Sequence, residues 1–171
     1  MDNFKIKIRN IKKEDIPDVV DININAWKEA YKGIIDDETL NNINREDKIK
    51  KREKDYKENG FIVAEIDKEV VGFCRYIDNL SKSPEITNAD CELIAIYVKP
   101  KYIKKGIGKC LFEYVKNEFR QMKKTKMIWW CLTDNKSARI FYDKMGGKVI
   151  AKKLKKIGEK SYEEVCYCID L

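Results

Sequence analysis

The chain has 171 residues, of which 43% are hydrophobic and 38% are charged, and its formal net charge is +7 at pH 7. This length and composition predict one globular domain over residues 1–171. No apolar run approaches the roughly 20 residues that cross a bilayer, and the sequence has no histidine and no Cys-x-x-Cys spacing, so neither a membrane protein nor a metal site is expected.

The amino-terminal segment alternates apolar and polar residues at Phe4, Ile6 and Ile8. This alternation predicts a strand and not a secretory signal, so the expected location is cytoplasmic. The six cysteines are spread over strand-like and helix-like segments, which favours buried, reduced thiols.

An amphipathic helix is predicted next, opening near Asp15 and Pro17, which suit a first turn, and stopping at Gly33. Its apolar stripe recurs at steps of three and four and consists of Ile16, Val20, Ile24, Trp27 and Tyr31. The following segments are predicted as a helical stretch over 37–59 with a break near Asn44, a strand hairpin over 61–66 and 70–76, and a polar loop over 79–88.

Residues 91–98 (CELIAIYV) form a nearly continuous apolar run, which is typical of a strand buried on both faces and predicts the central strand. A basic loop with Gly106 and Gly108 then leads into an amphipathic helix. The rest of the chain is predicted as a buried strand over 127–132, a short helix over 136–144, and a closing hairpin over 147–171 that turns near Gly158.

The segment KPKYIKKGIGK gathers five lysines around two glycines where a buried strand meets a helix. Such a junction binds anions, because glycine lets backbone amides approach a phosphate and a helix amino terminus presents unpaired donors. A dinucleotide fingerprint would need glycine at Leu111, and a Walker loop would need glycine at Lys104 and a hydroxyl residue at Cys110. An ordinary strand-to-helix connection remains the alternative.

The longer segment VKPKYIKKGIGKCLFEYV resembles the coenzyme A signature of the GNAT superfamily of N-acetyltransferases. The resemblance implies that the backbone of Ile96 and Val98 pairs with the pantetheine arm of acetyl-CoA. It also implies a set of residues around the pyrophosphate, namely Lys104, Lys105, Gly106, Ile107, Gly108 and Lys109. Ile103 departs from the pattern, since the superfamily usually has Arg or Gln at this place.

A second segment, TDNKSARIFYDKMGGK, resembles the Asn-x-x-Ala-x-x-Phe-Tyr helix of the same superfamily. This match implies that Asn135 contacts the cofactor arm and that Tyr142 protonates the thiolate that acetyl transfer releases. Core packing is the preferred interpretation of Phe141, and a buried tyrosine with a satisfied hydroxyl is the alternative for Tyr142.

A weaker match, AWKEAYKGIIDDETL, resembles the amino-terminal helix region of bacterial members that include spermidine/spermine acetyltransferases. It points to Trp27 and Tyr31 as acceptor-binding residues, although both also fit a simple core stripe. Because a protein of net charge +7 repels a polyamine, some of the acids Asp36, Asp37 and Glu38 are predicted to face the acceptor. The alternative is that these acids only favour the start of the next helix.

An amine attacks a thioester as the free base, so a proton acceptor is useful at neutral pH. The resemblance implies a carboxylate at the start of the central strand that acts directly or through water, so Glu92 is the candidate. Asp90 is its rival, and a solvent-facing glutamate is the alternative. Cys131 is the one thiol that suggests a covalent route, and a packed cysteine explains it as well.

The resemblance implies an α/β fold with a mixed, mostly antiparallel sheet of about seven strands, helices on both faces, and acetyl-CoA between the fourth and fifth strands. The predicted function is transfer of acetyl from acetyl-CoA to a small-molecule amine, foremost a polyamine, by direct attack in a ternary complex. A protein amino terminus or lysine is the alternative acceptor. The non-enzymatic alternatives are an acyl-CoA sensor and a basic nucleic-acid-binding module, the latter disfavoured because the lysines gather at the glycines. A homodimer is left open.

Overall fold

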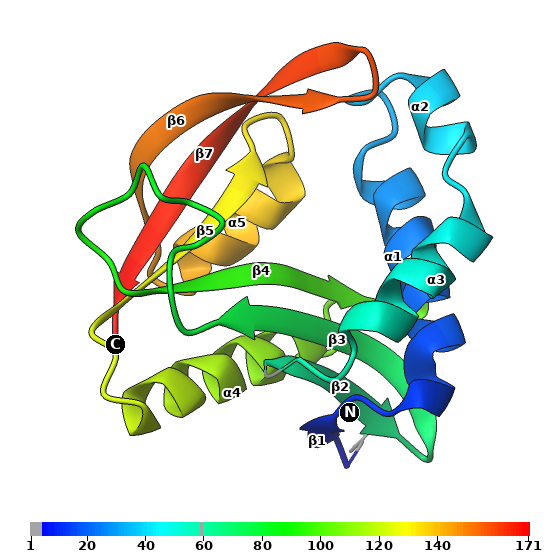
Figure 1. The fold of residues 1–171 in the computed structure, drawn as a ribbon, viewed down its shortest axis with the longest axis horizontal. Helices are drawn as coiled ribbons and strands as arrows, with labels where there is room; N and C mark the ends of the chain where they lie inside the picture. The colour runs from blue at the N-terminus through cyan, green and yellow to red at the C-terminus, as the bar shows by residue number, and fades with distance from the viewer. Residues whose placement is uncertain (1–4, 59) are drawn as a thin grey trace.

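The computed structural model describes residues 5–58 and 60–171, so Phe4, where the first predicted strand begins, lies outside the described residues. Figure 1 shows a curved sheet with helices packed on both sides. Its seven strands are β1 (Lys7–Asn10), β2 (Phe61–Ile66), β3 (Glu69–Ile77), β4 (Cys91–Val98), β5 (Lys126–Leu132), β6 (Lys148–Ile157) and β7 (Lys160–Asp170). Its helices are α1 (Ile16–Ala30), α2 (Asp37–Asn41), α3 (Arg45–Asp55), α4 (Ile107–Gln121) and α5 (Lys136–Lys144), with short 3-10 turns at Lys13–Asp15 and Pro100–Tyr102.

The strands lie in the order β1-β2-β3-β4-β5-β7-β6, and every neighbouring pair is antiparallel except β4 and β5. This parallel pair is short, because only Cys91 with Met127 and Glu92 with Ile128 are in register. Beyond Glu92 the two strands separate, and the opening between them is called the wedge below (Figure 1). The predicted mixed, mostly antiparallel sheet is confirmed.

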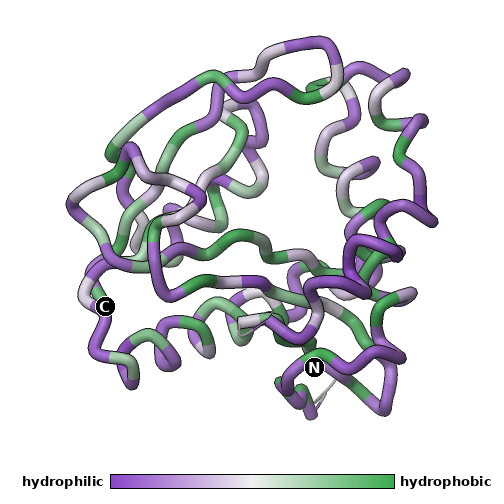
Figure 2. Tube along the Cα trace, in the orientation of Figure 1, coloured by the Kyte–Doolittle hydropathy of each residue, from purple (hydrophilic) through white to green (hydrophobic). Residues whose placement is uncertain are grey.

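Alternating side chains of the sheet supply two separate cores, which is why its central strands are apolar on both faces. On one face Ile62 and Ala64 of β2 pack with Leu111 and Phe112 of α4. On the other face the neighbouring positions Phe61 and Val63 pack with α1. Figure 2 accordingly shows hydrophobic residues along the central strands and a hydrophilic α3 on the outside.

The predicted helical stretch over 37–59 contains two helices, α2 and α3, with the break where it was expected. The second helix ends at Asp55, earlier than predicted, and Asn59 lies outside the described residues. Asp36 caps α2 by accepting from the Thr39 amide, and Asn44 caps α3 by accepting from the Asp47 amide. Both are good N-cap residues, and each side chain satisfies one free amide of a first turn. The loop over 79–88 is irregular, as predicted.

The β6–β7 hairpin reaches over the wedge and touches α2, as the upper part of Figure 1 shows. The Tyr162 hydroxyl donates to Asp36 Oδ2 at 3.1 Å, and the Asp36 amide donates to the Tyr162 hydroxyl at 3.3 Å. The turn at Gly158 lies so close to Thr39 that a side chain at this position would clash. The hairpin and α2 therefore bridge one side of the wedge.

Candidate active site

Residues 99–109, called the glycine loop below, join β4 to α4. Gly106 has a φ of 84° and begins α4 as its N-cap, a left-handed conformation that glycine adopts without strain. The Gly106 carbonyl accepts from Cys110, so the amides of Ile107, Gly108 and Lys109 belong to a first turn that has no partner within the helix and no side-chain cap. The predicted anion-binding geometry is present at this helix start.

Not every residue predicted around the phosphates offers a side chain. Ile107 is 1% exposed and packs in the core, so only its backbone amide can reach a ligand. A side chain added at Gly108 would make ordinary contacts with Phe141 and Val98 at 3.6 and 4.0 Å. Lys104, Lys105 and Lys109 are exposed beside the helix start. They supply charge next to the backbone amides.

Two further lysines of the glycine loop, Lys99 and Lys101, share one carboxylate, that of Glu69 at the start of β3. Its carboxylate lies 3.0 Å from Lys99 Nζ and 2.9 Å from Lys101 Nζ, and it accepts from the Tyr102 hydroxyl at 2.8 Å. These hydrogen bonds lower the pKa of Glu69 to about 2, and the hydrogen bond from Lys101 has the largest effect. Lys99, Lys101 and Glu69 together keep a net charge of +1, so most of the positive charge of the loop lies on Lys104, Lys105 and Lys109 at its carboxyl-terminal half.

The β4 edge of the wedge carries Ile96 and Val98, whose side chains pack on the α4 core. The register of β4 on β3 shifts between Arg75 and Tyr76, which leaves Ile94 without an opposite residue. Since the β5 register ends at Glu92, the backbone of β4 beyond this point has no paired β5 residue in the described chain. Such an edge can pair with an extended ligand or donate to an oxyanion.

Tyr142 lies on α5 and packs against aromatic residues of β5 and β7. Its ring packs on Trp129 at 5.3 Å and on Tyr167 at 5.6 Å. Burial raises the pKa of the Tyr142 hydroxyl well above its usual range, and Cys131 of β5 and Tyr97 of β4 raise it further. Trp129 directly follows Ile128, the last β5 residue in register with β4, so the Tyr142 ring lies beside the point where the two strands separate. Because burial raises its pKa, the hydroxyl stays protonated at neutral pH.

Asn135 begins α5 and is 8% exposed. Its side-chain oxygen accepts from the Ala138 amide at 3.1 Å and thereby caps the helix. The capping oxygen fixes the orientation of α5, which presents Tyr142. The predicted contact between Asn135 and the cofactor arm remains a prediction.

Trp27 and Tyr31 lie opposite β4 at the end of α1 and contact each other edge to face at 5.1 Å. Trp27 Nε1 donates to the Tyr97 hydroxyl at 2.9 Å. Burial raises the pKa of Tyr31, as do the nearby Tyr97, Cys131 and Tyr142. The two residues predicted to bind the acceptor therefore adjoin the wedge and also pack in a small core with Leu132.

Glu92 is 4% exposed, so the alternative of a solvent-facing glutamate is wrong. Its Oε1 accepts from the Ser83 hydroxyl at 2.9 Å, while its Oε2 is buried without a hydrogen-bond partner among the described residues. Burial raises the pKa of this carboxyl, against the lowering effect of the Ser83 hydrogen bond. A desolvated carboxylate with one free oxygen suits proton transfer.

Both carboxylate oxygens of the rival acid, Asp90, already accept hydrogen bonds within the fold. Its carboxylate accepts from the Thr125 amide and hydroxyl and from the Lys126 amide, at 2.9 to 3.2 Å. Burial opposes ionisation here, but these hydrogen bonds leave the pKa of Asp90 lowered. Asp90 therefore holds the start of β5, and the geometry favours Glu92 as the proton acceptor.

A second buried carboxylate, which the sequence did not single out, lies on the same face of the sheet as Glu92. The strand registers place Glu164 of β7 on this face, and it is 4% exposed. It lies 3.7 Å from Lys153 Nζ and 3.6 Å from Lys155 Nζ. Lys153 Nζ also lies 3.8 Å above the Trp130 ring and 2.6 Å from Glu85. This face, bounded by the β6–β7 hairpin and α2, is called the acceptor side below.

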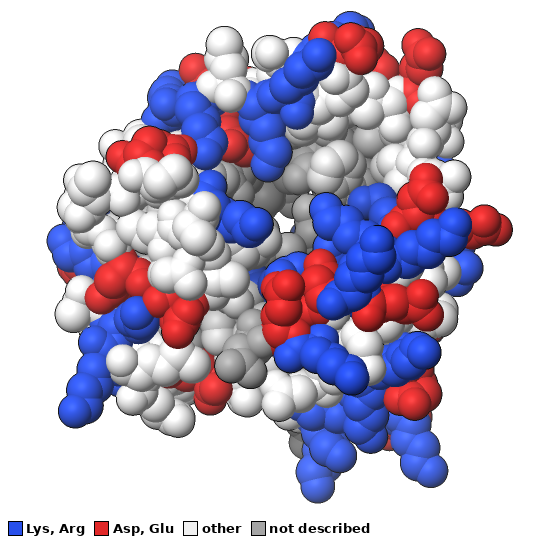
Figure 3. All heavy atoms as spheres, viewed as in Figure 1, with Lys and Arg blue, Asp and Glu red and all other residues white. Residues whose placement is uncertain are grey.

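Figure 3 shows a hollow near the middle of the molecule with lysine and arginine side chains along parts of its rim. By its place in Figure 1 it lies between β4, α1 and the β6–β7 hairpin. Near the hairpin, a pocket of about 320 Å³ is lined by Gly33, Ile34, Ile35, Asp36, Asp37, Lys160 and Tyr162. Two of the three acids predicted to face the acceptor, Asp36 and Asp37, thus border a pocket where the β6–β7 hairpin meets α2. Asp36 also caps α2.

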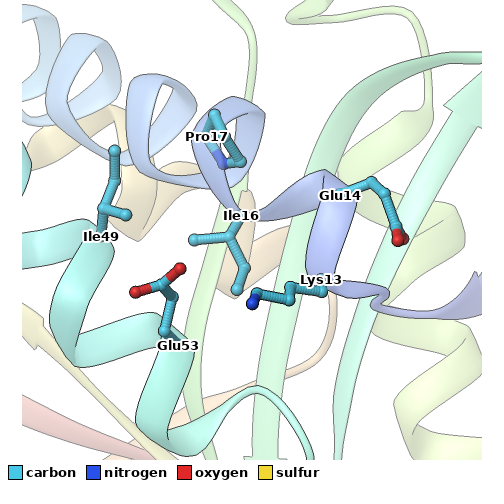
Figure 4. A pocket seen from close by; sticks show the side chains of 6 residues that line it. All are labelled: Lys13, Glu14, Ile16, Pro17, Ile49 and Glu53. Atoms are coloured by element: carbon cyan, nitrogen blue, oxygen red, sulfur yellow. The ribbon is translucent and has the colours of Figure 1, made fainter.

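A pocket of about 300 Å³ lies elsewhere, between the start of α1 and α3 (Figure 4). It is lined by Lys13, Glu14, Ile16, Pro17, Ile49 and Glu53. None of these residues belongs to the glycine loop, the wedge or the acceptor side. We assign no chemistry to it.

Cys131 is 8% exposed, and burial raises the pKa of its thiol to about 12. Its thiol donates to the Leu132 carbonyl at 3.4 Å. The nucleophile in thiol chemistry is the thiolate, which such an environment suppresses at neutral pH. The packed-cysteine interpretation is therefore the better one.

The fold agrees with the comparisons to known proteins. The Acetyltransferase (GNAT) family matches residues 24–147, and the chain belongs to that family, whose members are acyltransferase enzymes. The uncharacterized N-acetyltransferase YuaI of Bacillus subtilis is 31% identical over 141 residues, 80% of this chain and 77% of that protein. The spermidine N(1)-acetyltransferase of Thermoplasma acidophilum is 28% identical over 157 residues, 85% of this chain and 90% of that protein.

Among solved structures, the PaiA N-acetyltransferase of Thermoplasma acidophilum in complex with coenzyme A has a TM-score of 0.69 at 23% identity, over 94% of this chain and 98% of that one. Within the described residues, no group of His, Cys, Asp and Glu side chains could hold a metal ion. No described helix is long and apolar enough to span a membrane.

Proposed function

We propose that the chain transfers the acetyl group of acetyl-CoA to a small amine, foremost a polyamine, by direct attack in a ternary complex. The observation that carries this proposal is the wedge, which has a helix start with free amides at one end and Tyr142 where the strands separate. The family assignment supports acetyl transfer. We propose that residues 1–171 act as one acetyltransferase domain.

On this proposal the glycine loop holds the phosphates of acetyl-CoA by its backbone amides, from Gly106 to Lys109, with Lys104 and Lys105 adding charge. The unpaired edge of β4, around Ile96 and Val98, would receive the pantetheine arm. Backbone amides at the same edge would stabilise the oxyanion. These roles require backbone groups without a partner in the adjacent helix or strand, and the first turn of α4 and the β4 edge beyond Glu92 have such groups.

Proton transfer would be divided between Glu92 and Tyr142. Glu92 Oε2, buried and unpaired, would accept the proton of the attacking amine, directly or through water. Tyr142, protonated because burial raises its pKa, would donate to the thiolate that leaves. Trp27 and Tyr31 would bound the acceptor beside Tyr97.

Three features support a polyamine acceptor. The acceptor side carries the buried carboxylates Glu92 and Glu164. Two further acids, Asp36 and Asp37, border the adjoining pocket. The relative from Thermoplasma acidophilum is named for spermidine acetylation.

One observation favours the alternative acceptor, a protein amino terminus or lysine. Lys153, Lys155 and Lys160 of the β6–β7 hairpin lie at the acceptor side or its adjoining pocket and would repel a polycation. A peptide with acidic residues beside its amine would instead be attracted.

A panel of acceptors separates these alternatives. Purified protein with acetyl-CoA is assayed for thiol release with spermidine, putrescine, a monoamine of equal length, and neutral and acidic peptides with free amino termini. The proposal predicts the highest kcat/KM with spermidine. Release with peptides and none with spermidine would transfer the assignment to a protein acceptor, and binding of acetyl-CoA without turnover on any amine would indicate a sensor.

We propose a cytoplasmic location because the cysteines are reduced. All six are free thiols in the described structure, including the exposed Cys110. Free thiols persist in reducing compartments. Labelling of Cys110 in intact and lysed cells would test this location.

A further inference from the structure

The polar side chain of Ser83 is completely buried in the loop between β3 and β4, where it joins a strand residue to Glu92. Trp130 Nε1 of β5 donates to Ser83 Oγ at 2.8 Å, and Ser83 Oγ lies 2.9 Å from Glu92 Oε1. An indole N–H can only donate, so Ser83 Oγ accepts from Trp130. The one hydroxyl proton of Ser83 is therefore directed to Glu92.

We infer that Ser83 is the positioning residue for the proton acceptor of the reaction, holding Glu92 by one carboxylate oxygen so that the other faces the amine. This inference rests on the proposed function, in which Glu92 accepts that proton. It assigns a catalytic contribution to the β3–β4 loop, which the sequence shows only as a polar connection.

The loop is built to keep Ser83 in place. The Ser83 amide donates to the Leu80 carbonyl and the Ser83 carbonyl accepts from Ile86, so two successive turns fix its backbone. Ile86 is 8% exposed and packs with Ile128 and Cys166 beneath the loop. A loop pinned in this way can hold a hydroxyl in one orientation.

The pairing of Glu92 is incomplete in a way that a purely structural serine does not explain. Only Oε1 is hydrogen-bonded, whereas Oε2 is buried without a partner among the described residues. A buried polar atom left unpaired is costly unless a ligand or water meets it. The arrangement thus leaves one oxygen for chemistry and fixes the other.

Other ionisable groups surround the carboxyl, and they bear on its titration. Glu85 of the loop and Glu164 of β7 raise the pKa of Glu92, while Lys153 of β6 lowers it. The Cys166 thiol of β7 also interacts with Glu92. Burial raises the pKa most, and the Ser83 hydrogen bond opposes this by favouring the charged form.

The test is a carbon-13 NMR titration of the Glu92 side-chain carboxyl in the wild type, Ser83→Ala and Ser81→Ala. Ser83→Ala should raise the Glu92 midpoint by about one pH unit, because the charged form loses a hydrogen bond. Ser81→Ala, at an exposed position of the same loop, should leave it unchanged. An unchanged midpoint in folded Ser83→Ala would overturn the inference.

Kinetics add a readout that a structural role would not move. In wild-type background Ser83→Ala should lower kcat about tenfold at neutral pH with the KM for acetyl-CoA unchanged. In the Glu92→Gln background the same substitution should cost nothing further, because Ser83 acts through Glu92. Equal losses in both backgrounds would show a structural role and overturn the inference.

Two outcomes separate this inference from the proposed function. Full activity of Glu92→Gln would remove the proton acceptor from the proposed function, and the inference with it. An inactive Glu92→Gln with an unshifted Ser83→Ala would reject the inference alone. If circular dichroism shows that Ser83→Ala does not fold, Trp130→Phe takes its place and should raise the Glu92 midpoint by a smaller amount, with no shift as the contradicting result.

Discussion

On the proposed function, the glycine loop would bind the phosphates of acetyl-CoA and the acceptor side would bind an amine, and the two regions are built differently. The loop is one contiguous segment whose decisive groups are backbone amides at the start of α4, with exposed lysines beside them. The acceptor side is assembled from α1, β4, the β3–β4 loop, β5 and the β6–β7 hairpin, and its decisive groups are buried carboxylates. A phosphate group requires positive potential, whereas an amine requires a nearby carboxylate. On the proposed function the two requirements would be met by separate regions beside the wedge.

This difference indicates how strongly a side-chain substitution in each region should affect the binding of acetyl-CoA or of the amine. Backbone amides at a helix start depend on glycine and on helix geometry, so side-chain changes around them have small effects. The acceptor side depends on individual side chains, several of which hold one another. A single substitution there should therefore change chemistry or specificity more than one in the loop.

The largest effect is expected on the acceptor side, at Glu92. Glu92→Gln should lower kcat by about 10²- to 10⁴-fold, because a general base is removed while its volume is kept. In the wild type, activity should be lost as the pH falls through the raised pKa of Glu92, and this acid limb should be missing from the residual activity of the variant. Initial rates across pH check both results.

Asp90→Asn is the matched control for Glu92→Gln. It removes a neighbouring acid that only ties the start of β5, so it should lower the melting temperature and leave kcat within a few-fold. A loss of kcat in Asp90→Asn as large as in Glu92→Gln would contradict the choice between the two acids.

Tyr142, on α5, should show the next largest effect. Tyr142→Phe should lower kcat by about 10²-fold and leave the affinity for acetyl-CoA unchanged, because the ring still packs on Trp129 while the proton donor is lost. Tyr114→Phe, on α4, is the control. Wild-type turnover at saturating substrate would return Tyr142 to a purely structural role.

In the glycine loop, Gly108→Val should weaken acetyl-CoA binding at least about tenfold, since branched methyl groups would obstruct approach to the helix start. The fold should survive, because a side chain here meets Phe141 at an ordinary 3.6 Å. Calorimetry on this variant and on Cys110→Val, an exposed position of the same helix, measures the difference. Equal affinities in folded protein would refute this placement of the cofactor.

The smallest effect is expected from the charge around the loop. Glu69→Gln removes the one negative charge that pairs with Lys99 and Lys101, so acetyl-CoA affinity should rise by at most about fivefold at low salt. The gain should disappear at high ionic strength, because exposed charges are screened. A large loss of affinity would mean that Glu69 instead holds these lysines in a binding geometry.

The two regions also differ in how far the sequence predicted them. The glycine loop could be located because its lysines and glycines are adjacent in the chain and begin a clearly amphipathic helix. Ser83, Trp130, Lys153 and Glu164 could not, because their proximity depends on the order of β5, β7 and β6 and on a packed irregular loop. For Glu164 the sequence offered one indication. Strand alternation places it on the same face as Cys166, but it does not predict which residues of other strands contact that face.

Glu92 was identified from its place at the start of the central strand, but its burial was not, since the loop that covers it has no periodic pattern. For the lysines the sequence predicted the clustering but not the ion pairs. The pairing of Lys99 and Lys101 with Glu69 arises because β3 lies beside β4. Contacts within a segment were predictable, and contacts between segments required the fold.

The measurement that tests the central claim most directly is the initial-rate pattern with acetyl-CoA and spermidine both varied. If the glycine loop and the acceptor side are occupied together and the amine attacks directly, double-reciprocal lines should intersect, and mass spectrometry should find acetylspermidine and no acetylated Cys131. Parallel lines together with acetylated Cys131 would show a covalent intermediate, and would contradict the account of two sites acting at once across the wedge.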